Sequence, residues 1–410
     1  MSGNAPTLRC PNCFSEKGST PICPQCQYDA RYAEAYSRIP VHTVLNNQYL
    51  LGRMLGKPGG FGMTYLAFDL NLNVKVAIKE FFPQNLVLRG ADRMQVIADS
   101  PENAQIFQDG LAGFLKEART LAQFDHANVV RVRNYFEANG SAYLVMDFYD
   151  GLNLSEVMER RGVFAQDEAI RLMMPILDGL RMVHQHGILH RDIKPENIYL
   201  ANGNRPILLD FGAARAAVGF KSQNMTMVLT PGFAPFEQYA STGHQGPFTD
   251  VYACAATLYY MTTGRIPPEA TARMETDTLI SPDAIVPGLN QSFCRVVAHG
   301  LSVRSENRPA TVQAFQDALL QVSSSYKPEP IPVSTEADRL ITCPHCDAIN
   351  KIPIGASLEQ ARCGACESLL IPRPNVVVAC PVCRTLNRIP SDWRLHEAQC
   401  GKCFATLGSA

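Results

Sequence analysis

The chain has 410 residues, of which 46% are hydrophobic and 18% charged, and its 37 Lys and Arg nearly balance its 38 Asp and Glu. This length favours two to three domains, and the composition excludes a wholly disordered chain, a collagen and a coiled coil. The formal net charge of −1 gives no global field that would attract nucleic acid or anionic lipid. The N-terminus lacks a signal-peptide pattern, and no stretch reaches the roughly 20 apolar residues of a membrane span. We therefore expect no membrane association, and nucleic acid is disfavoured as a partner, although a local basic patch could still exist.

The placement of the cysteines divides the chain. Twelve of the 14 cysteines form six Cys-x-x-Cys pairs near the two ends, whereas Cys254 and Cys294 stand alone in helical stretches and are expected to be buried. Paired cysteines without an export signal favour metal over disulfides and a reducing, cytoplasmic location. The expected organisation is a cysteine-rich module over 1–32, a large domain over 40–322, an exposed Ser- and Pro-rich linker over 323–339, and two more cysteine-rich modules over 340–373 and 377–410.

The large domain changes character along its length. Alternating apolar residues predict strands over 49–55, 64–69, 74–81, 129–137 and 142–148, with a helix around 114–124. Beyond Gly151 the period becomes helical, over 165–186, 249–263, 291–301 and 311–321. A strand-rich lobe followed by a helix-rich lobe predicts a bilobal α+β fold with a cleft between the lobes.

A glycine-rich turn joins the first two of these strands. Its glycines are Gly56, Gly59, Gly60 and Gly62. Glycines let the backbone approach a polyphosphate, although such a cluster alone is more often an ordinary turn. Lys79 lies in the middle of the apolar third strand and needs an anionic partner, for which Glu117 on the next helix is a candidate.

Two motifs carry more specific chemistry. Residues 190–198 read HRDIKPENI, and residues 210–212 read DFG after an apolar run. Oxygens of Asn197 and Asp210 suit Mg²⁺ on a nucleotide, because this metal prefers carboxylate, amide and phosphate oxygens. Asp192 is then free to accept the proton of an attacking hydroxyl.

With these motifs the stretch from Tyr49 to Gln321 resembles a protein kinase domain of the bacterial eukaryotic-like Ser/Thr type. The resemblance covers about two thirds of the chain and includes the principal motifs in order. It implies ATP in the cleft and transfer of the γ-phosphoryl group of Mg-ATP to Ser or Thr hydroxyls of protein substrates, with autophosphorylation. Asp192 would be the catalytic base, and Lys194, typical of Ser/Thr kinases, would steady the transferred group.

The resemblance also implies a nucleotide site. Lys79 would hold the α- and β-phosphates and pair with Glu117, and Asn197 and Asp210 would hold the metal. Ala77 and Tyr199 would enclose the adenine, although ordinary core positions explain these two equally well. The implied set is Leu55, Gly56, Gly59, Gly60, Gly62, Thr64, Ala77, Lys79, Glu117, Asp147, Tyr149, Asn197, Tyr199 and Asp210.

Supporting residues follow the same resemblance. Asp250 would support the catalytic loop, Glu237 would pair with Arg308, and Thr230 would contact the catalytic loop. Ser222 and Thr226 are candidate phosphorylation sites or ordinary loop residues, and Arg191 is a candidate to read such a phosphate. Leu121, Val132, His190 and Phe211 would stack as a spine.

The chain departs from the family pattern at two points. The glycine-rich turn carries one residue more than the family pattern, Pro58, and APFE stands where the family has Ala-Pro-Glu. Neither departure removes a catalytic group, so we expect an active enzyme.

The cysteine pairs predict structural zinc, at up to three sites. The ligand sets are Cys10, Cys13, Cys23 and Cys26; Cys343, Cys346, Cys363 and Cys366; and Cys380, Cys383, Cys400 and Cys403. Four thiolates from two tight turns suit tetrahedral Zn²⁺, and the doubling of every pair argues against redox dithiols. The two tail sets repeat with a shift of 37 positions, and they resemble the zinc ribbon of some bacterial thioredoxins.

The role of the ribbons is less specific. The tail has no excess of basic residues and few aromatics, so protein docking or self-association is favoured over nucleic-acid binding. Two alternatives to an active kinase remain: a nucleotide-binding scaffold of low activity, and a nucleic-acid-linked regulator. Intact Lys79, Asp192 and Asp210 favour the enzyme.

Overall fold

A computed structural model describes residues 9–29, 38–59, 62–201, 205–211, 229–239, 243–323, 339–342, 349–352, 362, 375–379, 381–382 and 386–390. The chain divides into two compact units, Met1–Lys327 and Pro328–Ala410. The first unit holds the large domain and the N-terminal cysteines.

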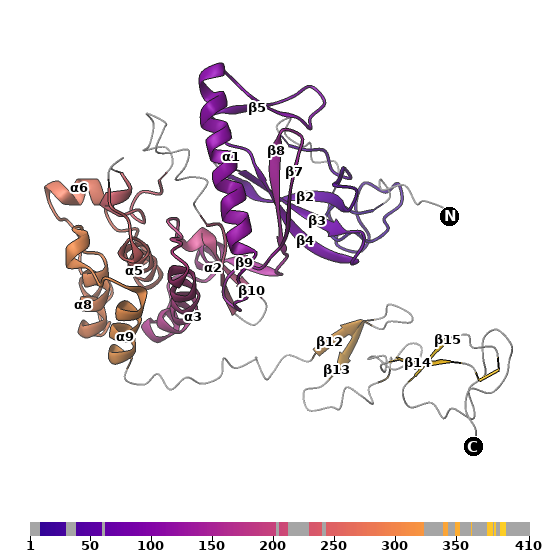
Figure 1. Cartoon of the computed structure of the whole chain (residues 1–410). Helices are drawn as coiled ribbons and strands as arrows, with labels where there is room; N and C mark the ends of the chain where they lie inside the picture. Colours follow the sequence, from indigo (N-terminus) through magenta and orange to yellow (C-terminus); the bar gives the residue numbers. More distant parts are fainter. Residues whose placement is uncertain are drawn as a thin grey trace. The chain divides into compact units, whose positions relative to one another are not determined.

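The first lobe is built on a six-stranded antiparallel sheet with the order β1-β2-β3-β4-β8-β7 (Figure 1). The strands are β1 (Val44–Leu45), β2 (Tyr49–Gly59), β3 (Gly62–Asp69), β4 (Val74–Phe81), β7 (Val132–Ala138) and β8 (Ser141–Asp147). Helix α1 (Pro101–Leu121) runs along this sheet and buries Phe107, Phe114 and Leu121 against it. The helix is longer than predicted, because Ser100 caps its first turn and Pro101 pre-sets the backbone there.

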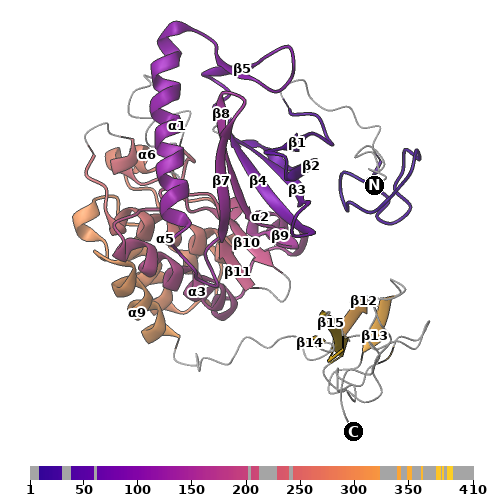
Figure 2. The ribbon, with the colours of Figure 1, turned by 45° about the vertical axis from the view of Figure 1, so that its right-hand side comes forward.

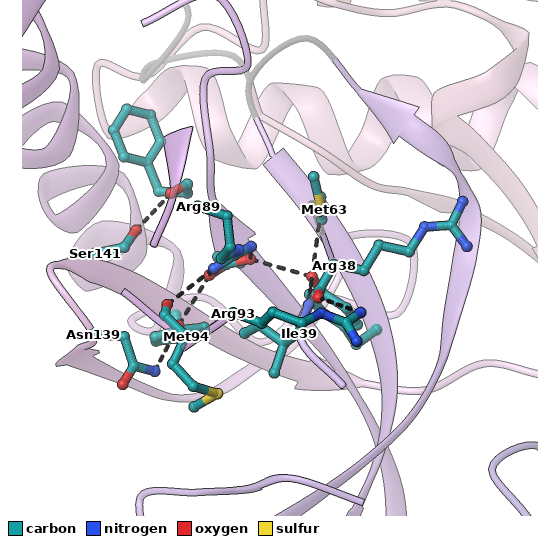
Figure 3. A network of polar contacts seen from close by, with 12 residues as sticks. Arg38, Ile39, Met63, Arg89, Arg93, Met94, Asn139 and Ser141 are labelled. Atoms are coloured by element: carbon teal, nitrogen blue, oxygen red, sulfur yellow. Dashed lines mark hydrogen bonds and ion pairs between the residues drawn. The ribbon is translucent and has the colours of Figure 1, made fainter. Parts of the chain in front are cut away.

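A short hairpin that the sequence analysis does not predict lies between β4 and α1. Its strands are β5 (Val87–Arg89) and β6 (Val96–Ala98). Arg89 forms a fully buried ion pair with Glu80 of β4, at 2.6 Å from Nη2 to Oε2 (Figure 3). Tyr65 and Tyr143 also donate hydroxyl hydrogen bonds to this carboxylate. Because the buried charges are fully partnered, the network fixes the hairpin to the residue that follows Lys79.

The second lobe is helical (Figure 2). Its helices are α2 (Leu154–Arg161), α3 (Gln166–Gln185), α5 (Pro247–Thr263), α6 (Ala270–Glu275), α7 (Pro282–Ile285), α8 (Gln291–Gly300) and α9 (Val312–Val322). A small sheet of β9 (Gly151–Asn153), β10 (Ile198–Ala201) and β11 (Arg205–Leu208) completes it. Helix α5 is buried on nearly all sides, with Cys254 in it and Cys294 on α8, both buried as predicted. The predicted bilobal α+β fold is confirmed.

The second unit contains two hairpins with the same register. They are β12 (Arg339–Thr342) with β13 (Ile349–Ile352), and β14 (Asn375–Ala379) with β15 (Leu386–Pro390). Thr342 pairs with Ile349, and the residues 37 positions later, Ala379 and Leu386, pair in the same way. The internal repeat is therefore also a repeat of structure. The eight tail cysteines lie outside the described residues.

Within the described part of the chain, no helix combines the length and the apolar character that crossing a bilayer requires.

Candidate active site

Asp250 of α5 fixes the loop that carries the HRD motif through hydrogen bonds to its backbone. The backbone N–H groups of His190 and Arg191 each donate to this carboxylate at 2.8 Å, and His184 Nε2 donates to it at 2.7 Å. Burial alone would raise the pKa of Asp250, but the hydrogen bond from His184 and the backbone donors hold it below its ordinary value. Asp250 therefore remains a carboxylate that orients the loop, as predicted.

His184 has a partner that the sequence analysis does not predict. No local motif marks this histidine as different from its neighbour His186. In the structure it is the side chain through which α3 contacts Asp250. Only the fold, which brings α3 beside α5, identifies this contact.

The predicted catalytic base is oriented on two sides. Asn197 Nδ2 donates to both the backbone oxygen and Oδ2 of Asp192, each at 2.7 Å. Lys194 Nζ lies 3.3 Å from Asp192 Oδ1 and donates to Thr230 Oγ1 at 2.9 Å. The short 3₁₀ turn η2 (Pro195–Asn197) brings Asn197 back onto the aspartate. The predicted contact of Thr230 with the catalytic loop is thereby confirmed.

Asp210 lies at a strained position between this loop and the first lobe. Its backbone φ of 56° is rare for a residue other than glycine, and such strain is concentrated at functional sites. Asn197 O accepts the N–H of Leu209 at 2.8 Å, which places the two predicted metal ligands close together. Lys79 Nζ donates to Asp210 Oδ1 at 2.7 Å. Glu117 lies on the buried face of α1, and its pairing with Lys79 stays a prediction.

The glycine-rich turn is extended by a bulge in β2. Leu55 pairs with Thr64 and Gly59 pairs with Gly62, so four steps along β2 face two along β3. Gly56 has a φ of 67°, the left-handed region that favours glycine. The residue that is extra relative to the family is thus accommodated inside the strand. Gly60 lies outside the described residues.

The predicted adenine-binding residues come from three strands and the segment after β8. Ala77 of β4 pairs with Met146 of β8. The Asp147 N–H donates to Arg131 O at 3.0 Å, and the Asp147 carboxylate pairs with Arg133. Tyr199 of β10 donates to Gly151 O at 2.7 Å. Their roles toward a nucleotide stay predictions, as does that of Tyr149.

The segment after the DFG motif is anchored at its far end. Arg308 makes a bidentate ion pair with Glu237, with its Nη1 and Nη2 at 2.7 and 2.9 Å from the carboxylate oxygens, as predicted. Gln238 Nε2 donates to the backbone oxygen of Arg191 at 2.9 Å, so this anchor also contacts the catalytic loop. Gly212 and the candidate phosphorylation sites Ser222 and Thr226 lie outside the described residues.

One contact of the predicted spine, between His190 and Phe211, is present in the structure. The rings of His190 and Phe211 lie 4.5 Å apart. Phe211, Leu121 and Val132 are buried in the same hydrophobic core. The stacking of Leu121 and Val132 on these two rings stays a prediction.

The N-terminal cysteines form a compact cluster of two equivalent turns. The sulfur atoms of Cys10, Cys13, Cys23 and Cys26 all lie within 4.8 Å of one another. The separations are 3.6 Å for Cys10–Cys26 and 3.7 Å for Cys13–Cys23. Four sulfurs about 2.3 Å from a tetrahedral zinc ion would lie about 3.8 Å apart, whereas a disulfide bond is only about 2.05 Å long. The donor set and its spacing therefore fit Zn²⁺.

Comparisons with known proteins agree with this geometry. A family model of the protein kinase domain matches residues 49–320, and the chain belongs to this family. Over 307 residues it is 31% identical to the serine/threonine-protein kinase PknB of Mycobacterium leprae, covering 72% of this chain and 46% of that protein. It is 28% identical over 300 residues to serine/threonine-protein kinase D of Synechocystis, covering 70% of this chain and 55% of the relative.

A solved structure has a similar fold. The structure titled "PpkA-294 apo form" shares 34% sequence identity with a TM-score of 0.63, covering 69% of this chain and 99% of that chain. The chain spans about half the length of the curated relatives it matches. The family and the bilobal fold are thus shown for the large domain.

Proposed function

We propose that the protein is a Ser/Thr protein kinase that transfers the γ-phosphoryl group of ATP, with Mg²⁺, to hydroxyl groups of protein substrates. The observation that carries the proposal is the arrangement around Asp192, whose carboxylate contacts Asn197 Nδ2 and Lys194 Nζ at once. The Asp192 carboxylate is thus held in a fixed position to accept a proton from a substrate hydroxyl, with the Lys194 ammonium group beside it.

Each of these residues has a distinct task in the proposed reaction. Asp192 would orient the attacking hydroxyl and accept its proton, in a position fixed through Asp250. Lys194 would stabilise negative charge on the transferred group, since its Nζ lies between Asp192 and Thr230.

The donors for magnesium are the carboxylate of Asp210 and the amide oxygen of Asn197. The amide nitrogen of Asn197 is already committed to Asp192, which leaves Oδ1 as the ligand atom. Mg²⁺ would neutralise phosphate charge and orient the nucleotide. Lys79 contacts Asp210 in the structure, and in the proposed complex it would bind the α- and β-phosphates and pair with Glu117.

The test is autophosphorylation of the purified full chain with Mg²⁺ and γ-labelled ATP, beside Lys79→Ala and Asp192→Ala. The proposal predicts label on Ser and Thr in the wild type and none in either variant. A wild-type protein that binds ATP measurably but never becomes labelled would instead support the low-activity scaffold.

We also propose that zinc occupies the N-terminal cluster and the two tail modules. The N-terminal sulfur separations support the first site, and the matched registers of the tail hairpins support a common design for the other two. Elemental analysis of the full chain should find about three zinc ions per chain, and a value near zero would reject the proposal.

The tail modules would dock protein substrates or a second copy of the chain, in the cytoplasm. Sedimentation of the full chain, compared with a variant lacking residues 340–410, tests for self-association. If both sediment as monomers, substrate docking is the remaining role.

A further inference from the structure

The N-terminal cysteine cluster does not stand apart from the kinase domain. Its first turn packs on the outer face of β2 and β3, the hairpin that carries the glycine-rich turn. Phe14 is only 4% exposed and shares a buried cluster with Leu50 and Leu66, while its ring lies 5.4 Å from that of Phe68. Leu55, from the implied nucleotide site, and Phe148, between Asp147 and Tyr149 of that site, are partly buried and pack against the same cluster. The cysteine module therefore covers an apolar face that would otherwise be exposed.

A backbone contact fixes the position of the module. The ladder between β2 and β3 skips a residue between Leu51 and Met54, which is a bulge that frees the Arg53 N–H from the sheet. Pro11 O, inside the first cysteine turn, accepts this N–H at 2.8 Å. Gly52 is required at the contact, because a Cβ there would lie 2.2 Å from Pro11 O. The bulge in β2 thus lies where the cysteine module binds the strand.

One side chain joins the cysteine cluster directly to this strand. Asn12 Oδ1 accepts a hydrogen bond from Arg53 Nε at 2.6 Å, while Asn12 Nδ2 donates to Cys26 Sγ at 3.5 Å. The backbone N–H of Asn12 also donates to Cys10 Sγ. Asn12 is therefore a single-residue link between the sulfur cluster and Arg53 of β2. Leu55 and Gly56, where the glycine-rich turn begins, lie two and three residues after Arg53.

The second cysteine turn is a natural internal control. Phe14 and Gln27 follow the last cysteine of their turns, and each has a positive φ, of 63° and 58°. Each also donates its backbone N–H to the backbone oxygen of the first cysteine of its turn at 2.9 Å. Gln27 is exposed, whereas Phe14 is buried. A bulky aromatic residue is costly at positive φ, so its presence in the docked turn alone is explained by its contact with the kinase sheet.

We infer that the N-terminal four-cysteine module is a brace of the nucleotide-binding lobe, in which Phe14 and Asn12 act as positioning residues that make ATP affinity depend on metal in the cluster. The inference deepens the proposed function and rests on zinc being the occupant of the cluster. With metal bound, the sulfur atoms are fixed, and Asn12 and Pro11 keep their hydrogen bonds to Arg53. The part of β2 that leads into the glycine-rich turn therefore keeps one position. Without metal the first cysteine turn loses its packing on β2 and β3. The glycine-rich turn is then less ordered, and ATP binding must order it.

The experiment compares Phe14→Gln with Gln27→Ala in the full chain. Phe14→Gln should raise the KM for ATP about fivefold or more, the lower end of typical coupling between two sites, with kcat within about twofold. The exchange of the Arg53 amide hydrogen should also become faster. Gln27→Ala should change neither. An unchanged KM for ATP in Phe14→Gln, even with a lower melting temperature, would show a merely structural module and overturn the inference.

A second pair of variants separates the brace from the zinc assignment. Cys26→Ser and Cys403→Ser each remove the last cysteine of a predicted site, and each should lower the zinc content by about one ion. Only Cys26→Ser should raise the KM for ATP and speed exchange at Arg53. If Cys26→Ser leaves the zinc content unchanged, the zinc assignment fails, and Phe14→Gln still decides whether the module braces the lobe. Asn12→Ala replaces Phe14→Gln if the latter does not fold.

Discussion

Lys79 Nζ and Asp210 Oδ1 lie 2.7 Å apart, so an ion pair joins a central strand of the first lobe to the segment that follows β11 in the second. Lys79→Met removes this cation from the site where phosphates and metal are proposed to bind. We expect a loss of about 100-fold or more in phosphoryl transfer, the usual effect of deleting one preorganised charge in an active site. Lys75→Met, on the same strand but exposed, is the control and should retain activity. Comparable rates for both variants would contradict the role of Lys79.

The contact of His184 with Asp250 should affect catalysis without affecting nucleotide binding. His184→Ala removes a hydrogen bond that orients Asp250, and with it the loop carrying Asp192. We expect kcat to fall about 10- to 100-fold, as small misplacements of catalytic groups do, with the KM for ATP nearly unchanged. His186→Ala changes an exposed histidine whose Nδ1 contacts Met182 O, and it should be neutral. Equal losses in both variants would contradict this assignment.

Glu237 and Arg308 should contribute strongly to stability. Glu237→Gln leaves the fully buried Arg308 guanidinium without its charge partner, which typically costs about 3 to 5 kcal/mol. The same change in Glu168, whose partner Arg161 is partly exposed, should cost less than about 1 kcal/mol. Urea denaturation of the two variants measures the difference, and similar free energies of unfolding would reject the prediction.

His190 should make the folded state sensitive to mild acid. It is fully buried, its Nε2 donates to Leu209 O, and its Nδ1 accepts the N–H of Asp192. Burial lowers the pKa of His190, although Asp250, Asp192 and Asp210 oppose this shift. The unfolded chain therefore binds the proton more readily, so the stabilisation is complete above the unfolded pKa and is lost as pH falls below it.

The expected loss from His190 alone is at most about 1.4 kcal/mol per pH unit below about 6.5. Urea denaturation at several pH values between about 5 and 8 should show this slope in the wild type and a smaller slope in His190→Tyr. Identical slopes would mean that His190 does not titrate on unfolding.

Much of the fold and site was predictable because kinase chemistry is confined to short motifs. Asp192, Asn197 and Asp210 lie in contiguous stretches whose spacing places them in one loop and at one strand end. The structure accordingly brings Asn197 onto Asp192 and beside Leu209. The strands were also predicted well, because alternation is clear where one face is buried.

The remaining features depend on long-range packing that no local pattern records. The hairpin of β5 and β6 is too short to give a periodic signal, and it depends on Arg89 meeting Glu80. The partner of His184 is 66 residues away. In the same way, Leu50 and Leu66 have the pattern of ordinary strand residues, and only the fold shows that Phe14 covers them.

The most direct test of the central claim is phosphoryl transfer between two full-length chains. Wild-type protein is mixed with an excess of Asp192→Asn chain carrying a distinguishing tag, together with Mg²⁺ and γ-labelled ATP. We expect label on Ser and Thr residues of the tagged chain, and none when Lys79→Met replaces the wild type. Absence of label on both chains, with wild-type protein that demonstrably binds ATP, would contradict it.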